Sequence, residues 1–134
     1  MFKLIKILNS GVNVPEPCRI AKESAAEIKM GSALILDGGY ATNCPETVRP
    51  EYIALEDSGA GKTYVLAYTV SENMIFETPI TDSPEALTEG VSVTLSQDDN
   101  GAAVAVSATT DSGVAKIVSL DGAANAGDKI SVKF

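Results

Sequence analysis

From Gly31 onward the sequence is a series of short apolar or alternating runs separated by turn residues. These runs are rich in Val, Ile and Thr, which favour strands, and they include ALIL, YIAL, TYVLAYTV, MIFETPI, VSVTLS, AAVAVSAT, VAKIVSL and DKISVKF. Their spacing, roughly 8–12 residues, is typical of sandwiches and small barrels. The pattern therefore predicts a mainly β protein, built as a small antiparallel barrel or sandwich.

The residues before Gly31 depart from this pattern. Residues 22–30, KESAAEIKM, hold the only credible helix, which is about two turns long and marginal by itself. An irregular segment fits these residues equally well. We therefore expect at most one short helix in the chain.

The first 17 residues predict an extended N-terminal arm. FKLIKIL at 2–8 can form a strand, and Pro15 and Pro17 hold the following backbone extended. We expect an arm over 1–17 and a single β domain over 18–134. An ordinary edge strand packed on its own domain is an equal alternative for these residues.

Two turns are predicted in detail. An Asp-Gly-Gly turn at 37–39 separates two short runs, so residues 31–44 should form a hairpin. The acidic stretch 97–102, QDDNGA, lacks the alternating acids and final glutamate of a calcium loop. It predicts a second hairpin turn.

The string GAGKT at 59–63 resembles a nucleotide-binding loop, but three observations argue against that function. The motif requires a glycine at position 56, where this chain has Glu56, and Asp57 adds a second charge that would repel phosphates. The residues after Thr63 favour a strand, whereas a phosphate-binding loop leads into a helix. We expect no nucleotide binding, and a loop over 58–62 with Lys62 exposed at its tip.

Composition excludes several further classes of function. The sequence has 134 residues and no histidine, which excludes Ser-His and Cys-His nucleophilic catalysis and His-ligated zinc. A net charge of −8 disfavours nucleic acid as a partner. The apolar run at the start is too short for a signal peptide or a membrane span, so we expect no membrane partner, and synthesis in a reducing cytoplasm. Cys18 and Cys44 are expected to be two half-buried thiols, with a disulfide as the alternative.

Few aromatic side chains are available as a sugar-binding platform. Tyr52, Tyr64, Tyr68 and Phe76 fall in predicted strands and are expected to be core or interface anchors. The carboxylates of the 81–90 loop are spread out, which makes glycosidase chemistry a weak hypothesis. We therefore expect no enzyme, no cofactor and no metal site.

The layout of the chain resembles the small capsid decoration (head-stabilising, or cement) proteins of tailed phages. The resemblance lies in the order of several stretches: KLIKILNSGVNVPEP, GSALILDGGYATNC, RPEYIALED, MIFETPI, EGVSVTLSQDDNGAAVAV and GDKISVKF. It spans nearly the whole chain without a single signature motif.

This resemblance implies a non-enzymatic structural protein of the virion. Such a protein would be made in the cytoplasm of the bacterial host, bind the major capsid protein on the outside of the shell as a homotrimer, and bridge capsomers. The arm is expected to contribute by strand addition, through residues Phe2, Leu4, Ile5, Ile7, Val12 and Val14. The alternative is a ligand- or carbohydrate-binding β module of a phage fibre or cell surface.

Overall fold

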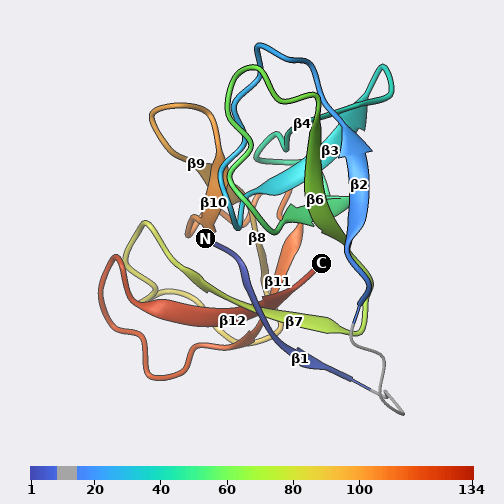
Figure 1. Ribbon diagram of the computed structural model, residues 1–134. Coiled ribbons are helices and arrows are strands. Elements are labelled where there is room, and N and C mark those ends of the chain that lie inside the picture. Colours follow the sequence, from blue (N-terminus) through green and yellow to red (C-terminus); the bar gives the residue numbers. More distant parts are fainter. Residues whose placement is uncertain (9–14) are drawn as a thin grey trace.

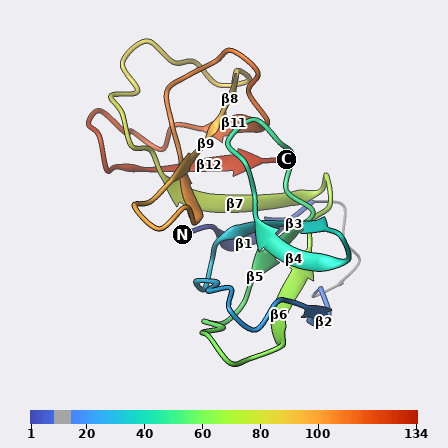
Figure 2. The ribbon, with the colours of Figure 1, turned by 90° about the horizontal axis from the view of Figure 1, so that it is seen from above.

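The computed structural model describes residues 1–8 and 15–134 as two antiparallel β-sheets that pack face to face (Figures 1 and 2). The sequence predicted a small antiparallel barrel or a sandwich. The sheets form a sandwich and do not close into a barrel. Among the described residues there is no helix, and hence none that is long and apolar enough to cross a membrane.

Sheet A has five strands among the described residues, and their spatial order mixes distant parts of the chain. That order is β1 (Lys3–Ile7), β7 (Met74–Pro79), β12 (Lys129–Lys133), β11 (Ala115–Ser119) and β8 (Ser92–Val93). All four pairings are antiparallel. The order places β7 between the first and the last strand of the chain, as Figure 1 shows.

Sheet B has seven strands among the described residues. Its order is β2 (Cys18–Ala21), β6 (Tyr64–Thr69), β5 (Tyr52–Ala54), β3 (Ala33–Asp37), β10 (Ala103–Val106) and β9 (Leu95–Gln97), and β4 (Tyr40–Asn43) pairs with β3. The sheet curls until β2 and β4 come into contact, although no strand pairing joins them.

The main core lies between the two sheets. Leu4, Phe76, Val132 and Ile117 are successive cross-strand partners in sheet A, so their side chains share the face that meets sheet B. The fully buried side chains of this core include Ala33, Phe76, Ile80, Val93, Leu95, Ala103, Val106, Ala115, Ile130 and Val132. One face of each sheet therefore supplies the apolar side chains of this core.

A second, smaller core fills the curl of sheet B. Its buried members are Ile20, Ile28, Leu34, Ala41, Ala54, Val65 and Ala67. Several of these are alanines, which allows the strands to come close together around a small interior. Ile28 comes from the segment 22–30, which is irregular and joins the core through an isolated bridge to Ser58.

The ammonium group of Lys22 holds this irregular segment in place. Lys22 is 1% exposed, and its Nζ donates hydrogen bonds to the carbonyl oxygens of Glu23 at 3.1 Å, Ala26 at 2.6 Å and Gly59 at 3.1 Å. Three donors meet three acceptors, which satisfies a charge that would otherwise be costly to bury. The side chain thereby ties residues 22–26 to the loop that carries Gly59.

The predicted hairpin and turns form where the sequence places them. Gly38 and Gly39, with φ of 56° and 87°, connect β3 to β4 as a two-residue turn in which both residues are left-handed. Asp98 Oδ1 accepts hydrogen bonds from the backbone N–H of Asn100 at 2.9 Å and Ala102 at 3.0 Å, which closes the turn between β9 and β10. The stretch 97–102 is thus a hairpin turn, as expected.

Candidate functional site

The strand β1 forms one edge of sheet A and carries three of the six residues predicted to bind a partner. It pairs with β7 of the same chain, with a bulge between Leu4 and Lys6. Among the described strands, β7 is its one neighbour. In the isolated chain residues 3–7 thus take the edge-strand alternative, while the division into an arm over 1–17 and a domain over 18–134 stays a prediction.

The side chains of the first strand point in two directions. Phe2 is buried, with its backbone N–H bonded to the Gly31 oxygen at 2.8 Å, and Leu4 and Ile7 pack against the main core. Ile5 is 48% exposed at the bulge. Val12 and Val14 lie outside the described residues. Among the four predicted side chains that the structure describes, Ile5 is therefore the most exposed.

An apolar hollow of about 250 Å³ lies beside the first strand, where the two sheets meet. Met1 and Leu4 line it from one side, and Met30, Leu55 and Tyr68 from the other. Met1 and Met30 are 48% and 46% exposed. Methionine side chains adapt to irregular surfaces, so the edge of sheet A combines an open strand with a deformable apolar border.

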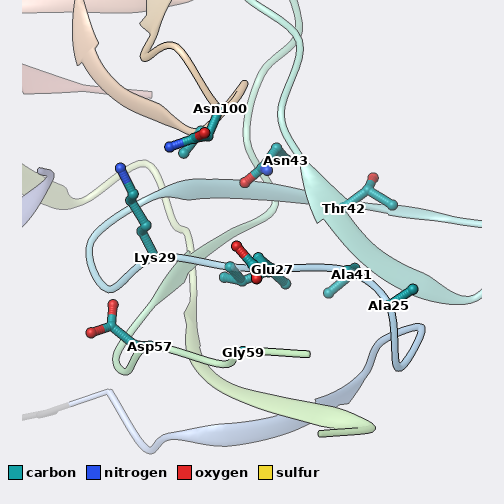
Figure 3. A pocket seen from close by; sticks show the side chains of 12 residues that line it. Ala25, Glu27, Lys29, Ala41, Thr42, Asn43, Asp57, Gly59 and Asn100 are labelled. Carbon is teal, nitrogen blue, oxygen red and sulfur yellow. The ribbon is translucent and has the colours of Figure 1, made fainter. Parts of the chain in front are cut away.

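A second hollow, of about 790 Å³, lies between residues 25–29, strand β4 and the turn at Asn100 (Figure 3). Its rim is polar: Lys29 forms an ion pair with Asp98, and Asp57 Oδ1 accepts a hydrogen bond from the backbone N–H of Met30 at 2.8 Å. The bond to Lys29 lowers the pKa of Asp98 and raises that of Lys29. Asn43 Oδ1, on the wall of this hollow, is buried with no hydrogen-bond partner among the described residues.

The GAGKT stretch forms a loop between β5 and β6. Ser58 Oγ donates a hydrogen bond to the Tyr64 oxygen at 2.7 Å, and Gly61 adopts a left-handed φ of 89° while its N–H bonds to the Ser24 oxygen at 2.7 Å. Lys62 is exposed, as predicted. A strand, β6, follows the loop where a phosphate-binding loop would start a helix.

Both thiols are free, so neither forms a disulfide. Cys18 Sγ, half-buried, donates to the Ala67 oxygen at 3.3 Å, and Cys44 Sγ donates to the Val48 oxygen at 3.1 Å. Burial raises the pKa of Cys44 to about 12. The sequence predicted two half-buried thiols, and the structure differs in burying Cys44 completely.

The four aromatic residues predicted to be anchors all lie on strands. Phe76 is fully buried, whereas Tyr52, Tyr64 and Tyr68 are half-buried on β5 and β6. The guanidinium carbon of Arg19 lies 3.9 Å from the centre of the Tyr64 ring, a cation–π contact that fastens β2 to β6. Within residues 1–8 and 15–134, no group of three or more His, Cys, Asp and Glu residues is placed to hold a metal ion.

Comparison with solved structures identifies a similar fold. The chain matches the crystal structure of the N base of head fiber gp8.5 in bacteriophage phi29 with a TM-score of 0.55 and 17% sequence identity. The match covers 89% of this chain and 94% of that chain, so it includes both sheets. No family model and no curated protein sequence matches this chain. At this identity the likeness concerns the fold.

Proposed function

We propose that this chain is a non-enzymatic structural protein of a phage virion, which decorates the outside of the capsid and stabilises it. The observation that carries the proposal is the match of nearly the whole fold to the base of a phage head fibre. The order of its sequence motifs, which resembles that of capsid decoration proteins, supports the same class independently. The partner in this proposal is the major capsid protein.

The edge strand β1 supplies a physical means of attachment. Among the described residues no strand pairs with the outer side of β1, and an edge strand of this kind can accept a further strand from a neighbouring chain. Ile5 and the apolar border formed by Met1 and Met30 lie at this edge. In this proposal strand addition at β1 joins the protein to the shell, and a homotrimer bridges adjacent capsomers.

A second candidate function is suggested by the same structural match. The matched protein is described as the base of a head fibre, which favours a fibre module that binds a ligand or carbohydrate as the alternative. The half-buried tyrosines on β5 and β6 offer little platform for sugars. Decoration therefore remains the preferred proposal.

Purified virions of the phage whose genome encodes this sequence provide the test. We expect mass spectrometry to find the protein in the particles, and immunogold labelling to place it on the head surface. Its absence from purified particles would contradict the proposal, and labelling at the tip of a fibre would favour the second candidate. A glycan array with no binding would disfavour the second candidate.

Hydrogen exchange tests strand addition separately from the location of the protein in the virion. We expect the amide hydrogens of a peptide covering residues 1–8 to exchange more slowly on the particle than in the free protein, because a new strand would occupy the open edge. A peptide covering β8 and β9 serves as the internal control. Equal exchange of residues 1–8 in both states would contradict attachment through β1.

A further inference from the structure

The strand register places five lysines on the outer face of sheet A. Lys3 pairs with Glu77, which pairs with Ser131, and Ser131 lies two residues from both Lys129 and Lys133. Side chains of cross-strand partners, and of alternate residues in a strand, point to the same side of a sheet. These residues therefore share the face opposite to the Phe76 core.

The same geometry adds two more lysines to this face. Lys133 pairs with Lys116 on β11, and Lys6 pairs with Ile75, which lies two residues before Glu77. We call Lys3, Lys6, Lys116, Lys129 and Lys133 the basic face. Four of them are exposed and Lys133 is half-buried. Figure 1 shows β1, β7, β12 and β11 side by side in this sheet.

Charge is strongly segregated in this molecule. The basic face holds five of the ten Lys and Arg residues, although the net charge is −8. On the described strands of sheet A, Glu77 is the one acidic residue, and Asp121 reaches the face through a hydrogen bond from Ser131 Oγ at 2.6 Å. The other five basic residues therefore share the remaining surface and interior with sixteen of the eighteen acidic residues.

The basic face does not help the isolated chain to fold. Lys129 forms an ion pair with Glu77 at 3.2 Å, but among the described residues Lys3, Lys6, Lys116 and Lys133 have no carboxylate within ion-pair distance. Lys116 and Lys133 are direct cross-strand partners, and like charges in that position repel. A feature that costs stability without a local compensation points to a role in binding.

We infer that the basic face docks on an acidic patch of a partner protein. The inference rests on the proposed function, in which that partner is a protein of the virion. Charge complementarity favours an acidic surface, and the surplus of carboxylates elsewhere on the molecule opposes close approach to long phosphate backbones or anionic membranes. A discrete acidic patch can match this face while leaving the rest of the molecule in solvent.

The segregated charge also sets the orientation of docking. An acidic partner repels most of this molecule and attracts sheet A, so the chain approaches with its basic face first. The edge strand β1 contributes Lys3 and Lys6 to that face. Docking through the basic face thereby brings the open edge of β1 to the partner surface, where strand addition can follow.

Fluorescence anisotropy on the full chain tests the inference, with a labelled, short poly-L-glutamate as the probe, chosen to be no longer than the basic face so that it stands for a discrete acidic patch. We expect binding at 20 mM NaCl that weakens steadily as the salt concentration rises. The double variant Lys116→Glu/Lys133→Glu should bind roughly tenfold more weakly, because two attractive charges of the basic face become repulsive. Absence of binding by the original chain at low salt would overturn the inference.

Lys62→Glu provides a matched control for the single variant Lys116→Glu. Both change the net charge by the same amount, and both remove an exposed lysine for which the described residues offer no ion pair. Lys116→Glu should weaken binding several-fold and raise the melting temperature, because it replaces the repulsion from Lys133 with attraction. Lys62→Glu should do neither, and equal weakening by both variants would overturn the inference.

Two further probes separate the classes of partner. Duplex DNA and phosphatidylglycerol vesicles should bind more weakly than poly-L-glutamate at the same ionic strength, and tighter binding of either would overturn the choice of a protein as the partner.

The analysis of purified virions tests the proposed function independently of these binding experiments. If the protein is found on heads but does not bind poly-L-glutamate, the proposed function stands and the inferred role of the basic face is wrong. If it binds poly-L-glutamate but is absent from heads, the role of the basic face stands and the proposed function is wrong.

Discussion

The ring of Phe2 lies 5.4 Å from the ring of Phe134, in an edge-to-face arrangement with an interplanar angle of 68°. The Phe134 ring is also 5.5 Å from that of Phe76. All three phenylalanines of the sequence thus form one cluster. Arg49 closes it by donating a hydrogen bond from its guanidinium group to the main-chain oxygen of Phe134 at 3.2 Å. Residues from opposite ends of the sequence therefore complete the same part of the core.

Truncation of Phe134 should be strongly destabilising. Phe134→Ala removes a nearly buried ring and two aromatic contacts, so we expect the free energy of unfolding to fall by about 3–5 kcal/mol. Urea denaturation measures this change. Ile5→Ala, at a side chain that is 48% exposed, should change it by less than about 0.5 kcal/mol. Similar losses for both variants would contradict the cluster's role.

The carbonyl oxygens around Lys22 should make this lysine structurally important. Lys22→Met keeps most of the apolar stem but leaves three carbonyl oxygens without their shared donor. We expect a loss of roughly 2–4 kcal/mol in the free energy of unfolding. Lys62→Met, at an exposed loop position, is the control and should be nearly neutral. A neutral Lys22→Met would show that water replaces the ammonium group.

The two thiols should differ in reactivity. At pH 8 we expect 5,5′-dithiobis(2-nitrobenzoic acid) to modify Cys18 in the native protein and to leave Cys44 unmodified, because Cys44 is buried and its pKa is raised to about 12. Guanidinium chloride should expose the second thiol. In Cys18→Ser the native protein should show no fast reaction, and a fast reaction there would contradict the burial of Cys44.

The ion pair between Lys29 and Asp98 should make stability depend on pH in the acid range. The pKa of Asp98 is lowered first by the hydrogen bond from Lys29 and then by the N–H of Ala102. A lowered pKa in the folded state means a contribution that is present above the ordinary pKa of about 3.9 and is lost as pH falls through the folded value.

Asp98→Asn isolates this charge because it keeps a side-chain oxygen for the turn. We expect it to lower the melting temperature at pH 6, with the difference from the original chain closing as the pH falls below about 4. Asp99→Asn, in the same turn, should have little effect at either pH. A constant difference for Asp98→Asn across this range would contradict an electrostatic origin.

Local features of the fold were predictable from the sequence because short-range physics determines them. The alternation that marks VSVTLS and DKISVKF corresponds to β8, β9 and β12, and the Asp-Gly-Gly turn at 37–39 forms the tight connection between β3 and β4. Glycine at 38 and 39 permits the left-handed backbone that this turn requires. These inferences needed only neighbouring residues.

Long-range features were not predictable in the same way. Nothing near Lys22 in the sequence indicates that Gly59 will supply one of its acceptors. The basic face was also missed, because Lys3 and Lys116 share a side of the sheet only through the register of four strands. Alternation fixes the face within a strand, whereas pairing between distant strands fixes which faces combine.

The position of β7 between β1 and β12 has a consequence for how the protein folds. Because β12 spans residues 129–133, the core of sheet A cannot be completed until nearly all of this sequence is available. Pairing strands so far apart in the sequence costs much conformational entropy before their stabilising contacts form, which slows folding. During synthesis, β1 must wait for β7, and the complete sheet must wait for β12. We therefore expect sheet A to be completed in a late step, and the edges of the earlier strands to stay open to pairing with other chains until then.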